Sequence, residues 1–145
     1  RPDMAPWKFT KAILEGKAID VYNHGKLQRD FTYIDDIVEG VLRIADQVPA
    51  TANYPTQLAG NPYYALYNIG NNQPVALEDF ITAIEDAAGV KAQKNYLPMQ
   101  AGDVYQTYAD VSLLQKTAEF KPNTALAVGI SNFVSWFLTH NGGKN

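Results

Sequence analysis

Apolar residues recur at helical spacing in four stretches of the chain, which predict helices at about residues 4–15, 34–48, 77–88 and 126–138. Acidic side chains open the second and third stretches, as the helix dipole favours. Gly16 and Gly89 end the first and third stretches, and Thr124 is the expected N-cap of the last. A shorter helix is expected after Asp110.

Short segments that favour β-structure lie between these helices, at residues 18–22, 31–33, 64–69, 93–97 and 104–108. The alternation predicts a mixed α/β fold. Residues 64–69 are apolar on both faces, which is typical of a strand inside a covered parallel sheet. Because the chain offers that strand few partners, we expect it to complete a sheet supplied from elsewhere. Residues 49–62 predict a surface loop, too short to divide the chain into two domains.

Composition narrows the function classes. Twelve basic and fifteen acidic residues give a net charge of −3 without a basic cluster, so no nucleic-acid partner is expected. No apolar run is long enough to span a bilayer, so no membrane partner is expected either. The absence of cysteine excludes thiolate metal sites and disulfides. His24 and His140 lack partners at metal-ligand spacing, so no metal is expected.

Four blocks of sequence resemble, in order, motifs of the extended short-chain dehydrogenase/reductase family. The run RDFTYIDDIVEG at 29–40 is similar to a block shared by nucleotide-sugar epimerases and dehydratases. The others are RPDMA at 1–5, YNIGN at 67–71, and LPMQAGDV at 97–104 followed by TYAD at 107–110. The first and last resemble UDP-glucuronate 4-epimerases most. The resemblance covers essentially residues 1–145, as the C-terminal UDP-sugar-binding portion of an extended Rossmann-type fold.

The resemblance implies an NAD-dependent, cytoplasmic enzyme that interconverts UDP-glucuronate and UDP-galacturonate by oxidation at C4, rotation of the keto sugar and reduction. Its NAD-binding glycine-rich turn is absent from this chain, so we expect an N-terminal NAD-binding half to be missing and the chain alone to be inactive. The start at Arg1, without methionine, fits that expectation. Tyr22 and Lys26 match the spacing of the family's catalytic pair. The intervening Asn-His-Gly predicts a turn, so we reject them as that pair.

Arg29 is the leading candidate ligand residue. Its planar charged fork suits a diphosphate, and the resemblance implies contact with the UDP phosphates. The alternative is a surface ion pair with Asp35 or Asp36, or a charge at the end of a strand. By resemblance Arg1 meets the sugar carboxylate; the alternative is a frayed terminus.

Asp103 stands where relatives hold ribose hydroxyls, and the alternative is an aspartate that stabilises a turn. Gln100 replaces an Arg of galactose-type relatives, which shifts phosphate binding toward Arg29. Tyr22 is implied beside the uridine, and Met4 and Ala5 near the nucleotide, although packing explains the last two equally well.

Three other interpretations stay open at this point. The parent enzyme could be a UDP-galactose 4-epimerase or a UDP-glucuronate decarboxylase. The chain could also be a non-catalytic module that binds nucleotide sugars. An exposed sheet edge and an apolar helix face would favour a homodimer.

Overall fold

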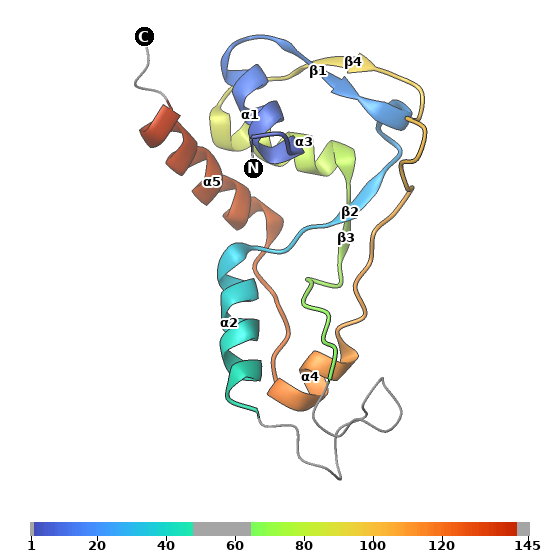
Figure 1. Ribbon diagram of the computed structural model, residues 1–145. Helices are drawn as coiled ribbons and strands as arrows, with labels where there is room; N and C mark the ends of the chain where they lie inside the picture. The colour runs from blue at the N-terminus through green and yellow to red at the C-terminus, as the bar shows by residue number, and fades with distance from the viewer. Residues whose placement is uncertain (1, 48–64, 142–145) are drawn as a thin grey trace. The chain divides into compact units, whose positions relative to one another are not determined.

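The computed structural model describes residues 2–47 and 65–141, which fall into two compact units (Figure 1). The first unit comprises the described residues up to 29 together with 74–107 and 125–141. The second comprises the described residues of 30–73 together with 108–124. The backbone therefore passes from one unit to the other four times.

Three helices form the core of the first unit: α1 (Ala5–Leu14), α3 (Leu77–Ala88) and α5 (Leu126–Asn141). α3 packs against both α1 and α5. The side chains of Ile13, Phe80 and Val134 are buried, because the apolar stripes of the three helices face one another. α3 ends at Gly89, whose φ of 68° lies in the left-handed region that glycine adopts without strain.

Two small sheets complete this unit. β1 (Ala18–Val21) and β4 (Gln93–Tyr96) are parallel, with Ala18 opposite Gln93 and Val21 opposite Tyr96. β2 (Gln28–Asp30) pairs with β3 (Pro74–Ala76). The 3₁₀ segment η1 (Tyr22–Gly25) connects β1 to β2. Because β1 and β4 are parallel, the segments that follow them leave from the same edge of their sheet.

The second unit contains α2 (Ile34–Ala45) and α4 (Ser112–Ala118), which pack against each other. Gly40 lets α2 lie close to two residues outside α4, since a Cβ there would lie 3.2 Å from the side chain of Ile69 and 3.4 Å from that of Phe120. The opposite face of α2 is exposed, although four of its residues are apolar: Ile34, Val38, Val41 and Leu42.

The predicted helices are confirmed, but two predicted strands are wrong. Residues 31–33 and 104–108 form no strand, because a strand needs a backbone partner and the described residues give these segments none beyond a single bridge between Gln106 and Gln28. Residues 65–69 have no strand partner among the described residues, and their pairing with a sheet supplied from elsewhere stays a prediction. β3 was not predicted. Thr124 is not the cap of α5, since the carbonyl of Ala125 accepts the first helical bonds. The predicted loop at 49–62 lies outside the described residues.

No helix within residues 2–47 and 65–141 is long and apolar enough to cross a membrane.

Candidate functional site

The parallel pair β1–β4 positions most of the predicted ligand residues. Tyr22 directly follows β1, and the segment that follows β4 leads to Gln100 and Asp103. Two backbone bonds join these segments: Leu97 donates to the carbonyl of Val21 at 3.0 Å, and His24 donates to that of Leu97 at 3.0 Å. In α/β proteins ligands bind beyond the carboxyl ends of parallel strands, so this edge is the candidate site.

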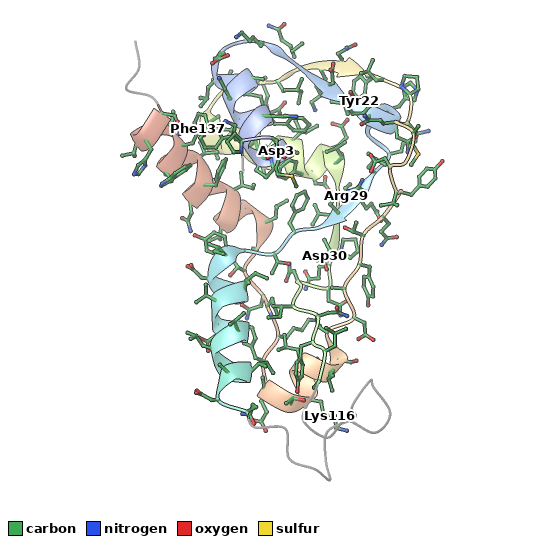
Figure 2. All side chains as sticks on the ribbon, in the orientation of Figure 1. Asp3, Tyr22, Arg29, Asp30, Lys116 and Phe137 are labelled. Atoms are coloured by element: carbon green, nitrogen blue, oxygen red, sulfur yellow. The ribbon has the colours of Figure 1, made fainter. Side chains whose placement is uncertain are left out.

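Arg29 reaches the same region from β2 (Figure 2). Its Nη2 lies 2.5 Å from Oδ1 of Asp103, which forms an ion pair between residues 74 positions apart in the sequence. Its Nη1 donates to the carbonyl oxygens of Gln28 at 2.9 Å and of Val104 at 2.8 Å. The guanidinium plane is thus oriented by main-chain carbonyls on one nitrogen and by a carboxylate on the other.

This arrangement leaves binding capacity on Arg29. A guanidinium has five N–H donors, and the bonds above use three of them, so Nε and one N–H of Nη2 have no partner among the described residues. The side chain is 26% exposed, so solvent and ligands can reach it. The alternative prediction, an ion pair with Asp35 or Asp36, is wrong. Arg29 pairs with Asp103, and Asp36 accepts backbone amides instead.

Asp103 stabilises a turn, as the alternative interpretation expects, and its contact with ribose hydroxyls stays a prediction. Its Oδ1 accepts the amide of Val104 at 2.9 Å, and its own amide donates to the carbonyl of Gln100 at 3.2 Å, so it stabilises the turn. Gly102, with a φ of 84°, supplies the left-handed residue of that turn. Oδ2 has no hydrogen bond among the described residues, and the side chain is 29% exposed. A hydroxyl donor can therefore still approach it.

The structure gives the positions of the other predicted residues, but no described hydrogen bond joins them to Arg29. Tyr22 is half-buried in η1, and Gln100 is exposed in the segment after β4. Met4 is exposed before α1 and Ala5 is its first residue, and the described contacts join neither to Arg29. Arg1 lies outside the described residues.

The rejection of Tyr22 and Lys26 as a helical catalytic pair is confirmed. Asn23 and His24 between them have left-handed φ values of 50° and 51°, so residues 22–26 do not form an α-helix. Their side chains are therefore not aligned on one helix face.

Three acidic residues accept structural hydrogen bonds that the sequence does not predict. Glu78 accepts a bond from Lys94 and another from Tyr96. In the second unit, Asp30 accepts the amides of Asn72 and Ala109. The sequence predicts only a helix-dipole role for Asp36 and Glu78, because they open helices. The alternation of Lys94 and Tyr96, which places both on one face of a strand, is a sequence signal for the bonds to Glu78.

A surface hollow of about 330 Å³ lies along α1, lined by Trp7, Lys11 and Lys17 among others, and includes none of the predicted ligand residues. Lysine side chains of this kind are solvated, and two of them pair with Glu15. Within residues 2–47 and 65–141, no group of three or more histidines and carboxylates is arranged to hold a metal ion.

Comparison with known proteins matches residues 3–70 to the NAD dependent epimerase/dehydratase family. Protein CapI of Staphylococcus aureus is 50% identical over 146 residues, covering 97% of this chain and 43% of its own length. UDP-glucuronate 4-epimerase 4 of Arabidopsis thaliana is 42% identical, covering 99% and 34%. The structure of UDP-glucuronic acid 4-epimerase from Bacillus cereus, in complex with UDP-glucuronic acid and NAD, has a TM-score of 0.77 at 28% identity, covering 94% and 41%.

The chain is therefore similar to the NAD dependent epimerase/dehydratase family over residues 3–70, and its mixed α/β fold matches the extended short-chain dehydrogenase/reductase fold of the Bacillus cereus enzyme. Its relatives include several UDP-glucuronate 4-epimerases. The chain spans 34% to 43% of the length of these relatives.

Proposed function

We propose that this chain is the UDP-holding part of an enzyme that epimerises UDP-glucuronate at C4. The pairing of Arg29 with Asp103 beyond the carboxyl ends of β1 and β4 supports this most directly. A permanently charged donor and a carboxylate there match the two polar parts of UDP, the diphosphate and the ribose diol. Relatives whose names specify UDP-glucuronate 4-epimerase support the choice of sugar.

In this proposal Arg29 binds the diphosphate through its two remaining N–H donors, while its bonds to main-chain carbonyls keep its plane fixed. Asp103 accepts a ribose hydroxyl at its second oxygen. Tyr22 flanks the uracil, and Gln100, Met4 and Ala5 contact the nucleotide. Arg1 meets the sugar carboxylate. Holding the nucleotide while leaving the sugar ring loosely bound allows the ring to turn between oxidation and reduction.

The described residues do not fit NAD. The left-handed glycines Gly16, Gly25, Gly89 and Gly102 stand singly in separate turns, and within residues 2–47 and 65–141 no glycine-rich turn joins a strand to a helix. We therefore propose that NAD is bound by the part of the enzyme that this chain does not span, and that the chain alone turns over no UDP-sugar. The exposed apolar face of α2 packs against that part in this proposal. A homodimer and a cytoplasmic location stay predictions.

Calorimetric titration of UDP into the complete protein that carries this chain tests the role of Arg29. Replacing Arg29 by Lys removes the planar fork, and since hydrogen bonds between charged groups contribute about 1.5–3 kcal/mol, we expect UDP affinity to fall about 10- to 100-fold. The matched control is Arg43→Lys, because Arg43 pairs with Glu39 in the second unit and is expected to leave affinity unchanged. An Arg29→Lys variant that binds UDP as tightly as the parent contradicts the proposal.

Two assays separate the alternatives. The complete protein is assayed for epimerisation of UDP-glucuronate, for epimerisation of UDP-galactose and for release of CO₂ from UDP-glucuronate. These three activities distinguish the two epimerases from each other and from the decarboxylase. UDP titrated into the 145-residue chain distinguishes a severed part, which we expect to bind weakly, from a module that binds on its own.

A further inference from the structure

The carboxylate of Glu78, on the first turn of α3, connects that helix to β4 through two side chains. Lys94 donates to Oε2 at 2.8 Å and Tyr96 donates its hydroxyl to Oε1 at 3.0 Å. Lys94 and Tyr96 are two residues apart in β4, so they project from the same face of the strand. Lys94 is also 3.9 Å from Glu85, about two turns further along the same face of α3. Glu78 therefore fixes the carboxyl-terminal end of β4 against α3.

The same carboxylate also lies against η1. A Cβ placed on Gly25 would be 2.6 Å from Oε1 of Glu78, closer than real side chains approach, and the φ of 79° at Gly25 itself favours glycine. η1 begins at Tyr22, and Tyr96 directly precedes the segment that carries Gln100 and Asp103. One carboxylate thus supports both segments that carry the proposed UDP contacts.

We infer that Glu78 is a positioning residue for the nucleotide, acting by holding η1 and the 97–103 segment in register at the edge of the β1–β4 sheet. This inference rests on the proposed function. Glu78 itself does not touch the ligand in this scheme. Loss of its bonds is expected to weaken UDP binding because Tyr22 and Asp103 must then be ordered at the cost of conformational entropy when the nucleotide arrives.

The protonation states of the partners favour a persistent network. The hydrogen bond to Glu78, together with its charge, raises the pKa of Lys94 against the opposing effect of burial. The hydrogen bond to Glu78 also raises the pKa of Tyr96, so the phenol remains a donor at neutral pH. Lys94 is only 21% exposed, so solvent screens its ion pair less than it screens a pair on the open surface.

The test uses Glu78→Gln and Tyr96→Phe in the complete protein. The matched control is Asp86→Asn, the same acid-to-amide change on the same helix, at a side chain whose ion pair among the described residues is with Lys91. With one or two hydrogen bonds lost, we expect UDP affinity to fall about fivefold in Glu78→Gln and about threefold in Tyr96→Phe. KM for the UDP-sugar should rise by similar factors while kcat changes less than about twofold. The NAD affinity of both variants, and the UDP affinity of Asp86→Asn, should stay at parental values.

The outcomes separate this inference from the proposed function. If the parent protein does not bind UDP, the proposed function fails and the inference fails with it. If the parent binds UDP and both variants bind it equally well, only the positioning role is overturned. An equal loss in Asp86→Asn, or a fall in kcat with unchanged KM, also overturns it. Should Glu78→Gln not fold, Tyr96→Phe decides, since its hydroxyl is on a half-exposed side chain.

Discussion

Each of the two units of this chain is stabilised internally by a different kind of interaction. The first unit buries a continuous apolar cluster from three helices and the β1–β4 sheet, including Ile13, Ile19, Phe80, Ile84 and Val134. In the second unit, by contrast, the described buried apolar side chains come from one segment, residues 111–122, at Val111, Leu114, Ala118 and Pro122. The apolar face of α2 remains outside that cluster.

Carboxylates that accept backbone amides do much of the organising in the second unit. Asp30 receives the amides of Asn72 and Ala109, which lie 42 and 79 positions away. Asp36 receives those of Asn123 and Thr124. Such bonds fix loops in place but do not remove apolar surface from water, which is the main source of folding free energy. The first unit has the core of a stable body, whereas the second is organised but under-buried. Four predictions test this contrast, from the largest expected effect to the smallest.

Replacing Phe80 by Ala should have the largest effect. Phe80 is fully buried and its ring lies 6.1 Å from that of Phe9, so removing it leaves a cavity and costs about 3–5 kcal/mol of unfolding free energy. Hydrogen exchange should accelerate in α1, α3 and α5 but not in α2 and α4. Equal acceleration in every helix would falsify the idea that the cores are separate.

Replacing Asp36 by Ala should cost about 1–3 kcal/mol, because two amides lose an ionised acceptor. Denaturant unfolding followed by a probe in the second unit measures the loss. Asp35→Ala is the control, since Asp35 is exposed and its removal should cost about 0.3–1 kcal/mol through the helix dipole. Equal costs for the two variants would argue against the anchoring role of Asp36.

Glu85 should make the first unit sensitive to acid. Burial raises the pKa of its carboxyl, but the bonds from Lys91 and the amide of Ala92 outweigh burial, so the pKa lies below its ordinary value of 4.5. A carboxyl with a lowered pKa stabilises the fold above its unfolded pKa and loses that contribution as the pH falls through the folded pKa. The stability of Glu85→Gln, measured by denaturant unfolding from about pH 6 to about pH 3, should therefore fall less steeply than that of the parent. Parallel curves would remove Glu85 as the cause.

Replacing Leu42 by Ala should have the smallest effect in the 145-residue chain. Leu42 is 57% exposed, so its truncation should change unfolding free energy by less than about 0.5 kcal/mol. If the proposed remainder of the enzyme covers α2, the same change should cost about 2 kcal/mol or more in the complete protein. A negligible cost in both contexts would leave the α2 face without a covering partner.

The helices were predictable because each carries a complete local signal. α2 and α3 have an apolar stripe, early acidic residues and, for α3, a glycine stop that the backbone uses as expected. Such signals are local in sequence, so they survive whatever the rest of the chain does.

The strands were less predictable because a strand is defined by its partner. β2 and β3 have three residues each and no alternation of apolar and polar positions, whereas residues 65–69 have the expected composition and no described partner. The candidate site was hard to predict for the same reason, because it depends on partners that are distant in the sequence. The pairing of Arg29 with Asp103 spans 74 positions, and only the family resemblance suggested that both belong to one site. The bonds of Asp30 and Asp36 are long-range and leave no periodic trace.

The two units alternate along the chain, and this order has a consequence for how such a protein can evolve. The backbone leaves one unit for the other after Arg29, Gln73, Thr107 and Thr124, so no single deletion removes one unit and leaves the other whole. A single crossover within residues 30–124 would divide both units. Point substitutions and changes in loop length, by contrast, leave the two units inherited together.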